Sequence, residues 1–330
     1  MDNKYKIVIT DFIADSLVIE KNIIGNVADI VALNAGDEKE LKGKIEDTDA
    51  IIMYHSLSIG QKTLDSLKKC KVVVRAGVGV DNIDHGYART AGIPVANIPD
   101  YGSEDVADSA IGMMLALTRG INFLNSRLRD GLGAWSYTQV KPLRRLRSSS
   151  LGIVGLGRIG TATALRAKAH GMKVFFYDPF KPDGYDKALG ISRAETLQNL
   201  LEQVHVLSLH CPLTNDNYHL INENTLRHLP RASYLINTAR GGLVDTASVA
   251  EAIATGQLAG AAFDVLEKEP PMNDRLVEAW KDAGHPAYHK VLINPHAAFY
   301  SEEGLQEIRV KSAQACLGAL EGAEIRNVVN

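Results

Sequence analysis

Three side chains that could support acid–base chemistry each come shortly after an apolar, strand-like run. Arg240 ends the stretch SYLINTAR, Glu269 comes a few residues after GAAFDV, and His296 follows KVLINP. An imidazole titrates near neutrality, so it can serve as a general base or acid, and a neighbouring carboxylate would raise its pKa and orient the ring. A guanidinium can hold a carboxylate and polarise an adjacent carbonyl through its planar fork. Together these groups suit hydride transfer between a secondary alcohol and a nicotinamide.

Arg240 alone leaves two interpretations open. An arginine at the end of an interior strand is costly to bury without a partner, and Gly241 and Gly242 follow it directly. The side chain could reach solvent before a Gly-Gly turn, or it could clamp an anion or a carbonyl in a cleft. The glutamate and histidine favour the clamp, and we then expect the glycines to let a negatively charged substrate approach the backbone.

The segment LGIVGLGRIGTATALRAKAHG carries a GxGxxG pattern between a strand-like run and a helix-like stretch, formed by Gly155, Gly157 and Gly160. The first glycine permits a tight turn, the second lets a pyrophosphate approach the backbone, and the third lets helix and strand pack closely. The unpaired N–H groups that begin the helix would bind the phosphates. The pattern in this context predicts a dinucleotide site.

The next strand-like run, KVFFYD, ends at Asp178, which lies 21 residues beyond Gly157. A carboxylate at this place can accept hydrogen bonds from the adenine ribose and would repel a 2′-phosphate. NAD is therefore favoured over NADP, and Arg158 and Lys181 are the residues that could weaken this preference.

Apolar strand-like runs alternate with helix-length segments along almost the whole chain. The expected strands are 6–10, 50–54, 72–76, 94–98, 151–155, 173–178, 205–210, 233–238, 260–265 and 290–294. Near-continuous apolar strands separated by helices are typical of parallel sheets covered on both faces, which predicts a doubly wound α/β fold. Because the carboxyl ends of parallel strands meet at one edge, Arg240, Glu269 and His296 are expected at the same rim.

The composition indicates a soluble, cytoplasmic protein of two domains. A chain of 330 residues exceeds the size at which a single core usually stops growing. The net charge of −3 offers no basic footprint for nucleic acid and no polybasic membrane patch. Three cysteines without a CxxC pair favour reduced thiols over a disulfide framework or a metal site. No signal peptide and no membrane-spanning stretch are expected.

Two helical segments suggest how the domains connect. Residues 100–131 are expected to form one long connecting helix with Ser103 as its cap, and its Met-rich apolar surface could be an oligomer interface or ordinary core. The cationic stretch 141–150 is expected to be a solvated turn. The capped helix at 300–322 is expected to return to the first domain. We therefore predict a discontinuous substrate domain at 1–102 and 296–330, with a cofactor domain at 103–295.

Four segments, GIVGLGRIG, NTARGGLVD, DVLEKEP and NPHAAF, resemble in order and spacing the signatures of the D-isomer-specific 2-hydroxyacid dehydrogenases. The resemblance covers essentially the full chain and implies a Rossmann domain inserted into a smaller flavodoxin-like doubly wound substrate domain, an NAD cofactor and a homodimer. It implies that Arg240, Glu269 and His296 are catalytic and that Asp264 contacts the nicotinamide amide. Further implied cofactor contacts are Val106, Arg158, Ile159, Cys211, Pro212, Thr238 and Ala239.

Within that family the segments IIMYHSLS, VVVRAGVGVDNID, LRAKAHGMKVFFYDP and HAAFYSEE resemble the C-terminal-binding protein branch. This likeness implies that Arg75 binds the substrate carboxylate, helped by backbone N–H groups at 77–79, although a strand-end surface arginine is the alternative. Phe299 stands where eukaryotic members of the branch carry tryptophan, and we expect no long C-terminal tail like that of the transcriptional corepressors. The implied substrate contacts are Tyr54, Arg75, Val78, Gly79, Arg240 and Phe299, and His55 and Tyr101 are further candidates for the pocket lining.

Three functions follow as hypotheses. The first is an NAD(H)-dependent enzyme that interconverts a small D-2-hydroxy acid and its 2-oxo acid. The second is an NADH-sensing interaction protein of the corepressor type. The third is a phosphoglycerate dehydrogenase-type enzyme, which would need extra basic residues for a substrate phosphate.

Overall fold

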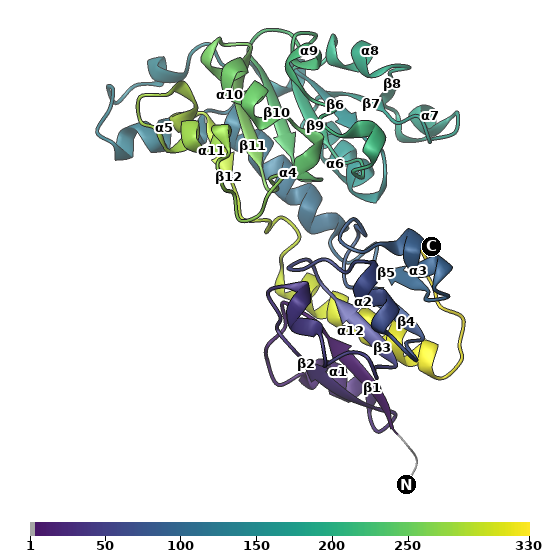
Figure 1. Cartoon of the computed structure of the whole chain (residues 1–330). Helices are drawn as coiled ribbons and strands as arrows, with labels where there is room; N and C mark the ends of the chain where they lie inside the picture. The colour runs from purple at the N-terminus through teal and green to yellow at the C-terminus, as the bar shows by residue number, and fades with distance from the viewer. Residues whose placement is uncertain (1–3) are drawn as a thin grey trace. The chain divides into compact units, whose positions relative to one another are not determined.

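The computed structural model describes residues 4–330 and divides the chain into two compact units. Unit 1 contains the chain up to Gly102 together with Ser301–Asn330, and unit 2 contains Ser103–Tyr300. Each unit is built on its own parallel sheet (Figure 1). None of the described helices has both the length and the apolar character that crossing a membrane requires.

Unit 1 has a five-stranded sheet in the order β2-β1-β3-β4-β5, in which every pair is parallel. This strand order is the flavodoxin-like one. The strands are β1 (Tyr5–Ile9), β2 (Ala28–Ala32), β3 (Ala50–Met53), β4 (Val72–Arg75) and β5 (Val95–Asn97). The helices are α1 (Val18–Ile24), α2 (Gln61–Ser66), α3 (His85–Thr90) and α12 (Glu302–Leu320), with a 3-10 turn at Glu38–Leu41. The expected flavodoxin-like architecture is confirmed.

Unit 2 has a seven-stranded parallel sheet in the order β12-β11-β10-β9-β6-β7-β8. The strands are β6 (Ser150–Val154), β7 (Lys173–Tyr177), β8 (Ser192–Arg193), β9 (Val206–Leu209), β10 (Ser233–Asn237), β11 (Leu258–Phe263) and β12 (Val291–Ile293). From β6 the chain builds outward to β8, then returns to place β9 on the other side of β6. This reversal is the topological switch point at which Rossmann-type sheets bind dinucleotides.

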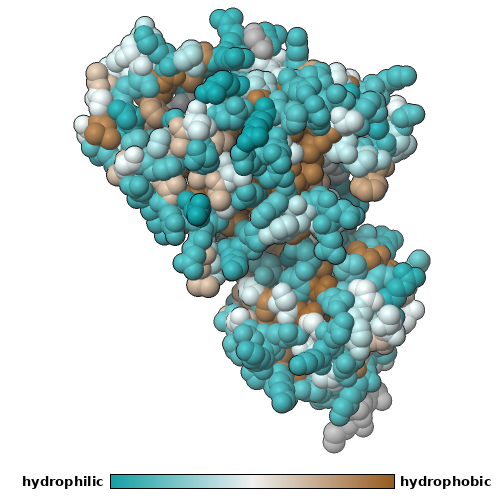
Figure 2. Space-filling model, turned by 45° about the horizontal axis from the view of Figure 1, so that its top comes forward, coloured by the Kyte–Doolittle hydropathy of each residue, from teal (hydrophilic) through white to brown (hydrophobic). Residues whose placement is uncertain are grey.

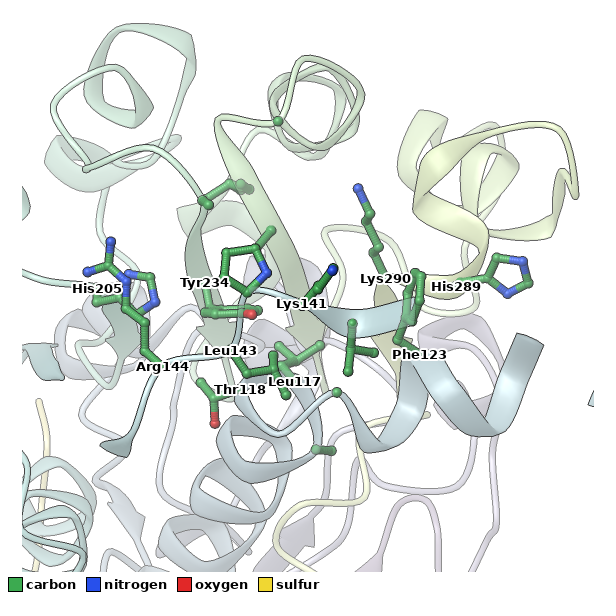
Figure 3. Close-up of a pocket in the computed structure, with 18 of the residues that line it drawn as sticks. Leu117, Thr118, Phe123, Lys141, Leu143, Arg144, His205, Tyr234, His289 and Lys290 are labelled. Atoms are coloured by element: carbon green, nitrogen blue, oxygen red, sulfur yellow. The ribbon is translucent and has the colours of Figure 1, made fainter. Parts of the chain in front are cut away.

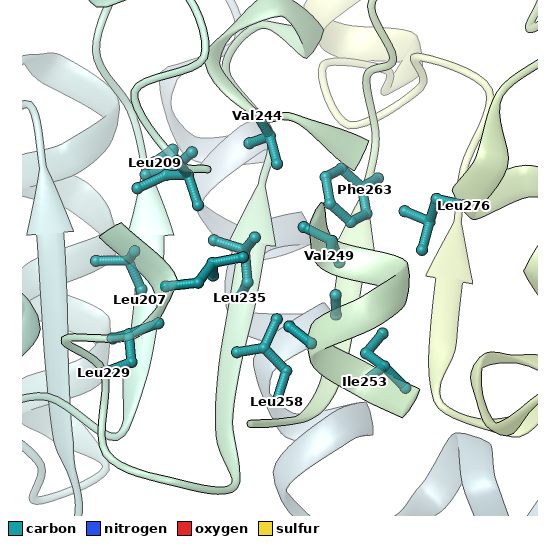
Figure 4. Close-up of a cluster of buried hydrophobic side chains, with 14 of the residues drawn as sticks. Leu207, Leu209, Leu229, Leu235, Val244, Val249, Ile253, Leu258, Phe263 and Leu276 are labelled. Carbon is teal, nitrogen blue, oxygen red and sulfur yellow. The ribbon is translucent and has the colours of Figure 1, made fainter. Parts of the chain in front are cut away.

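Helices cover both faces of the unit 2 sheet. They are α4 (Ser103–Thr118), α5 (Ile121–Arg129), α6 (Arg158–Ala169), α7 (Tyr185–Leu189), α8 (Leu197–Leu201), α9 (Glu223–Leu226), α10 (Thr246–Ala254) and α11 (Arg275–Lys281). Leu235 packs with Val249 of α10 in one buried cluster (Figure 4), whereas the next residue, Ile236, packs with Met114 of α4 in another. Because neighbouring strand residues point to opposite faces and both faces are buried, the strands are apolar throughout.

The number of strands, the length of the connecting helix and its cap differ from the expectations. Strands β2 and β8 were not expected, because β2 includes the polar, exposed Asp29 and β8 has only two residues. The expected long helix is broken between α4 and α5, where Gly120 has a φ of +65°. Ser103 is the first residue of α4, and its buried hydroxyl has no hydrogen-bond partner in the described part of the chain, so it is not a cap. Met113 and Met114 lie in the core of unit 2, which supports ordinary core packing for that helix face.

Residues 296–300 belong to unit 2, although the sequence placed them with 301–330. The cause is a set of hydrogen bonds to Asp264, which follows β11. The His296 N–H donates to the Asp264 carbonyl at 2.8 Å, and the N–H groups of Ala297 and Ala298 donate to its carboxylate at 2.9 and 3.0 Å. The boundary therefore lies just before Ser301, the N-cap of α12.

Candidate active site

The turn from β6 to α6 has the geometry that a dinucleotide requires. Gly155 has a φ of +89°, and a Cβ added there would lie 2.6 Å from the backbone nitrogen of Cys211. A Cβ on Gly160 would lie 2.1 Å from the Gly155 carbonyl oxygen, so the third glycine permits the close approach of helix and strand. A Cβ on Gly157 would meet no atom within 4 Å, which leaves the space that a phosphate needs beside the N-terminus of α6.

Asp178 lies beside this turn, directly after β7. Its Oδ2 accepts a hydrogen bond from the Leu156 N–H at 2.8 Å, and its Oδ1 accepts one from the Phe180 N–H at 3.0 Å. The carboxylate is thus fixed next to the glycine motif, as the ribose-binding hypothesis requires. Arg158 is exposed and Ile159 is half-buried in the first turn of α6.

The ends of β9 and β10 add two buried polar atoms without partners among the described residues. They are Nδ1 of His210 and the hydroxyl oxygen of Thr238. Buried polar atoms usually have partners, so two such atoms on neighbouring strand ends favour a ligand there. Cys211 and Pro212 continue the chain from His210, and Ala239 follows Thr238. These residues therefore fit a dinucleotide, together with the open glycine turn. Val106 is buried in α4.

His210 was not expected as a site residue. Its only signal in the sequence was that a histidine ends the apolar run HVLSLH. Its Nε2 lies 2.8 Å from the Ser208 hydroxyl, and burial lowers its pKa to about 4. Because the unfolded state then binds more protons between about pH 6.5 and 4, acidification through this window is expected to lower the free energy of unfolding by at least about 1 kcal/mol. The free energy of unfolding of the His210→Gln variant should fall less over the same pH window. Urea unfolding at several pH values measures this, and equal slopes would contradict it.

Arg240 is half-buried after β10 and donates from Nη1 to the Ala239 carbonyl at 2.7 Å. Asn237, fully buried at the end of the strand, shapes the loop: its amide nitrogen donates to the Arg240 carbonyl at 2.9 Å, and its amide oxygen accepts from the Ala239 N–H at 3.0 Å. Sequence reasoning missed Asn237, although a polar residue ending the run SYLIN was a signal. It is a positioning residue for Arg240.

The two glycines after Arg240 serve a purpose that was not expected. A Cβ on Gly241 would lie 2.0 Å from the carbonyl carbon of Leu266, so the backbone after β11 packs directly against this glycine. A Cβ on Gly242 would lie 2.9 Å from the Leu213 side chain. The expectation that the glycines open the backbone to a substrate is therefore wrong. They bring the loop that carries Arg240 against the segment that leads to Glu269.

Glu269 and His296 form a hydrogen-bonded pair, in which Oε2 and Nδ1 are 2.7 Å apart. Oε1 of Glu269 accepts from the Leu266 N–H at 2.8 Å, which fixes the carboxylate. His296 has a left-handed φ of 52°, held by its bond to the Asp264 carbonyl. The side chains of the pair are 26% (His296) and 36% (Glu269) exposed, so both are partly accessible to a ligand. The Phe299 ring lies edge-on to the imidazole, with centroids 6.2 Å apart.

Asp264 is almost fully buried, and its carboxylate binds the backbone of Ala297 and Ala298. Burial raises its pKa, while these hydrogen bonds and the nearby His296 oppose that rise. In the structure the carboxylate thus holds the loop that carries the histidine.

The unit 1 residues cluster at the carboxyl end of β4. Arg75 is buried, and its Nε donates to Asn82 Oδ1 at 3.3 Å, while Nη1 donates to the Ala76 carbonyl at 3.0 Å. Val78 is exposed and Gly79 is half-buried in the loop that follows. Arg75 is therefore held inside unit 1 and is not a strand-end surface residue.

Tyr54 has its side chain in the core of unit 1. Its N–H donates to Asp11 at 2.8 Å, and the same carboxylate accepts from the Ser56 N–H at 2.8 Å. Asp11 is fully buried and fixes the loop after β3. Sequence reasoning missed Asp11 and also Asn82, which donates to the Tyr54 and Leu57 carbonyls at 2.8 Å and accepts from Arg75. The structure gives the Tyr54 side chain a packing position, while the His55 ring lies tilted against Phe12, with ring centroids 4.9 Å apart.

Comparison with known proteins adds a family to this geometry. The family model for the D-isomer specific 2-hydroxyacid dehydrogenase NAD-binding domain matches residues 111–298. The chain is 32% identical to a D-3-phosphoglycerate dehydrogenase of Methanocaldococcus jannaschii over 98% of its own length and 59% of that protein. It is 34% identical to C-terminal-binding protein 1 of Caenorhabditis elegans over 92% of its own length and 42% of that protein. The chain thus spans about half the length of these curated relatives.

Solved structures agree in fold. A D-lactate dehydrogenase of Aquifex aeolicus, complexed with NAD and lactic acid, superposes with a TM-score of 0.86 at 26% identity and covers 96% of both chains. The TT0316 protein of Thermus thermophilus superposes with a TM-score of 0.83 at 30% identity and covers 98% of this chain and all of that one. With the two-unit architecture and the family match across the dinucleotide domain, the chain belongs to the D-isomer-specific 2-hydroxyacid dehydrogenase family.

Proposed function

We propose that this protein is an NAD(H)-dependent oxidoreductase that interconverts a small D-2-hydroxy acid and its 2-oxo acid. The observation that carries the proposal is the 2.7 Å pair of Glu269 and His296 within the family's NAD-binding domain. The fixed carboxylate of Asp178 and the open space at Gly157 support NAD as the cofactor. As further NAD contacts we propose the residues that the family resemblance implies: Val106, Arg158, Ile159, Cys211, Pro212, Thr238, Ala239 and Asp264.

NAD held at the glycine turn and Asp178 would supply the hydride acceptor for oxidation of the substrate carbon. His296 takes the hydroxyl proton at Nε2, since Nδ1 is held by Glu269. The carboxylate stabilises the imidazolium that results, and in the reverse direction the imidazolium returns this proton to the alkoxide oxygen. Arg240 holds the substrate carboxylate and polarises its carbonyl. Arg75, with Val78, Gly79 and Phe299, is proposed to complete substrate binding.

The proposal is tested by mixing the purified chain and NADH with a panel of 2-oxo acids. The panel should include short, branched, aromatic and phosphorylated members. Consumption of NADH with one unphosphorylated acid, and formation of the D-hydroxy acid, is the expected result. Turnover of the phosphorylated member alone would favour the phosphoglycerate dehydrogenase-type alternative. No turnover with any member would contradict an enzymatic role.

Asp178→Ala is expected to reduce the preference for NADH over NADPH about 10- to 100-fold, because it removes charge-assisted hydrogen bonds to the ribose and a repulsive charge. The ratio of kcat/KM for the two cofactors measures the effect. Asp183→Ala, at an exposed aspartate in the following loop, is the matched control and should leave the ratio unchanged. An unaltered preference in Asp178→Ala would remove this residue from the cofactor site.

The alternative of an NADH-sensing interaction protein is favoured by the 34% identity to C-terminal-binding protein 1. The two functions differ in one observable property. A sensor would bind a protein partner in an NADH-dependent manner and show no turnover with any member of the panel. In that case Asp178→Ala would weaken the binding of the protein partner.

We also propose a homodimer and a cytoplasmic location. The support for the dimer is a set of exposed apolar side chains on α5 and the loop after it: Ile121, Leu128, Leu132, Trp135 and Tyr137. Trp135 is 91% exposed, which is unusual for a large aromatic side chain, whereas the face drawn in Figure 2 is largely hydrophilic. Trp135→Ala with Ile121→Asp is expected to yield a monomer in analytical ultracentrifugation, and an unchanged mass would contradict this interface.

The three free cysteines support the proposed cytoplasmic location, because free thiols are typical of a reducing compartment.

A further inference from the structure

Unit 2 contains a second pocket at the opposite edge of its sheet (Figure 3). It has a volume of about 340 Å³, and its wall includes residues at the amino-terminal ends of strands, such as His205, Tyr234 and Leu258. The candidate active site lies at the carboxyl ends of the same sheet. Because a strand rises about 3.3 Å per residue, strands of four to six residues separate the two edges by roughly 13–20 Å. The pocket is therefore distinct from the dinucleotide site.

The wall of this pocket carries one sign of charge. It contains Lys141, Arg144 and Lys290, and none of its 20 lining residues is an aspartate or a glutamate. Burial lowers the pKa of His205, and the positive charge of Arg144 lowers it further. Arg144 lies beside His205 in Figure 3, which agrees with that influence. Cations that have no ion-pair partner among the described residues, gathered around a concave surface, attract an anion.

His205 provides a second, independent indication of a ligand. It lines the pocket with only 8% of its surface exposed, and its Nδ1 is buried without a hydrogen-bond partner among the described residues. Its ring lies edge-on to Tyr234, with centroids 5.6 Å apart, so packing holds its orientation. A neutral imidazole offers one donor and one acceptor, and an unpaired buried nitrogen is costly.

The rest of the wall is apolar. Leu117 at the end of α4, Phe123 of α5 and Leu143 lie with Leu258 around the cavity. An inorganic anion would pair with the cations but leave this apolar surface uncovered, and an apolar molecule would leave the cations unpaired. We propose that this pocket binds a small organic carboxylate with an apolar body, the acid group lying near Arg144 and the body against Leu117 and Phe123.

The probe for the test is 2-naphthoate, whose flat body and single carboxylate match the two halves of the pocket. Isothermal titration calorimetry is carried out on the full chain in saturating NADH, so that the dinucleotide site is occupied. Arg144→Gln is expected to weaken binding at least about 10-fold, because it removes a charged hydrogen-bond donor. Arg145→Gln is the matched control, since Arg145 is exposed, adjacent in sequence and not part of the wall, and it should change affinity less than about 2-fold.

Two further arms make the outcome decisive. The neutral isostere 2-naphthamide and inorganic phosphate should each bind at least about 10-fold more weakly than 2-naphthoate. Leu143→Glu should abolish binding by adding a carboxylate to the wall, while NADH affinity and the near-ultraviolet circular dichroism spectrum show that the variant is folded. The proposal is overturned if 2-naphthoate does not bind up to its solubility, if the amide binds equally well, or if Arg145→Gln is as damaging as Arg144→Gln.

Discussion

Replacing His296 with alanine is expected to lower kcat by about 10²- to 10⁴-fold, which is the usual contribution of a positioned general acid–base group. Affinity for NADH should change little, because the proposed dinucleotide contacts are at the glycine turn and Asp178. The Glu269–His296 pair also predicts a distinct result for Glu269→Gln. This variant keeps the imidazole but removes the carboxylate that orients it and stabilises the imidazolium, so kcat should fall, though less than in His296→Ala. Steady-state kinetics and NADH titrations measure these effects.

The structure offers a matched control for this prediction. His219 also pairs with a glutamate, since its Nε2 lies 2.9 Å from Oε2 of Glu267, two residues before Glu269. His219→Ala therefore removes an imidazole–carboxylate pair from the same segment but not from the proposed catalytic set, and it should retain turnover. If His296→Ala kept normal turnover, or if both variants lost it equally, His296 would not be the acid–base group.

The proximity of Glu269 and His296 could be predicted from sequence because two general rules apply to them. Each follows an apolar run, and runs of this kind form neighbouring parallel strands whose carboxyl ends meet at one edge. Strands β11 and β12 are indeed neighbours in the sheet. The positions of Glu269 and His296 after two apolar runs were thus enough to predict that both lie at the same edge of the sheet.

The supporting residues could not be predicted in this way. Asn237 and Asp11 act through hydrogen bonds to backbone groups, and those partners are set by loop conformations that no periodicity encodes. Strand β2 was missed because its register at the sheet edge exposes Asp29, so the strand lacks the apolar pattern of an interior one. The reason for Gly241 also depends on a tertiary contact, the approach of the Leu266 backbone.

Arg240→Gln is the second variant with a large expected effect, a loss of about 10²- to 10³-fold in kcat/KM, as is typical when a donor that stabilises developing negative charge is removed. Arg240→Lys should recover only part of this loss, because an ammonium is a point charge that cannot contact a carboxylate and a carbonyl oxygen with one planar fork. Initial rates over a range of substrate concentrations give kcat and KM separately. Arg231→Gln is the control, since Arg231 is exposed and donates to the Thr255 carbonyl.

The separation of kcat from KM decides what Arg240 does. A group that only binds the substrate carboxylate would raise KM with kcat unchanged, whereas a group that also polarises the carbonyl would lower kcat as well. We expect both parameters to change. Arg240 also donates to the Ala239 carbonyl, so a purely structural role would appear as a lower Tm and weaker NADH binding at unchanged kcat. That pattern would refute a role for the guanidinium at the reacting carbonyl, while leaving the Glu269–His296 pair as the acid–base element.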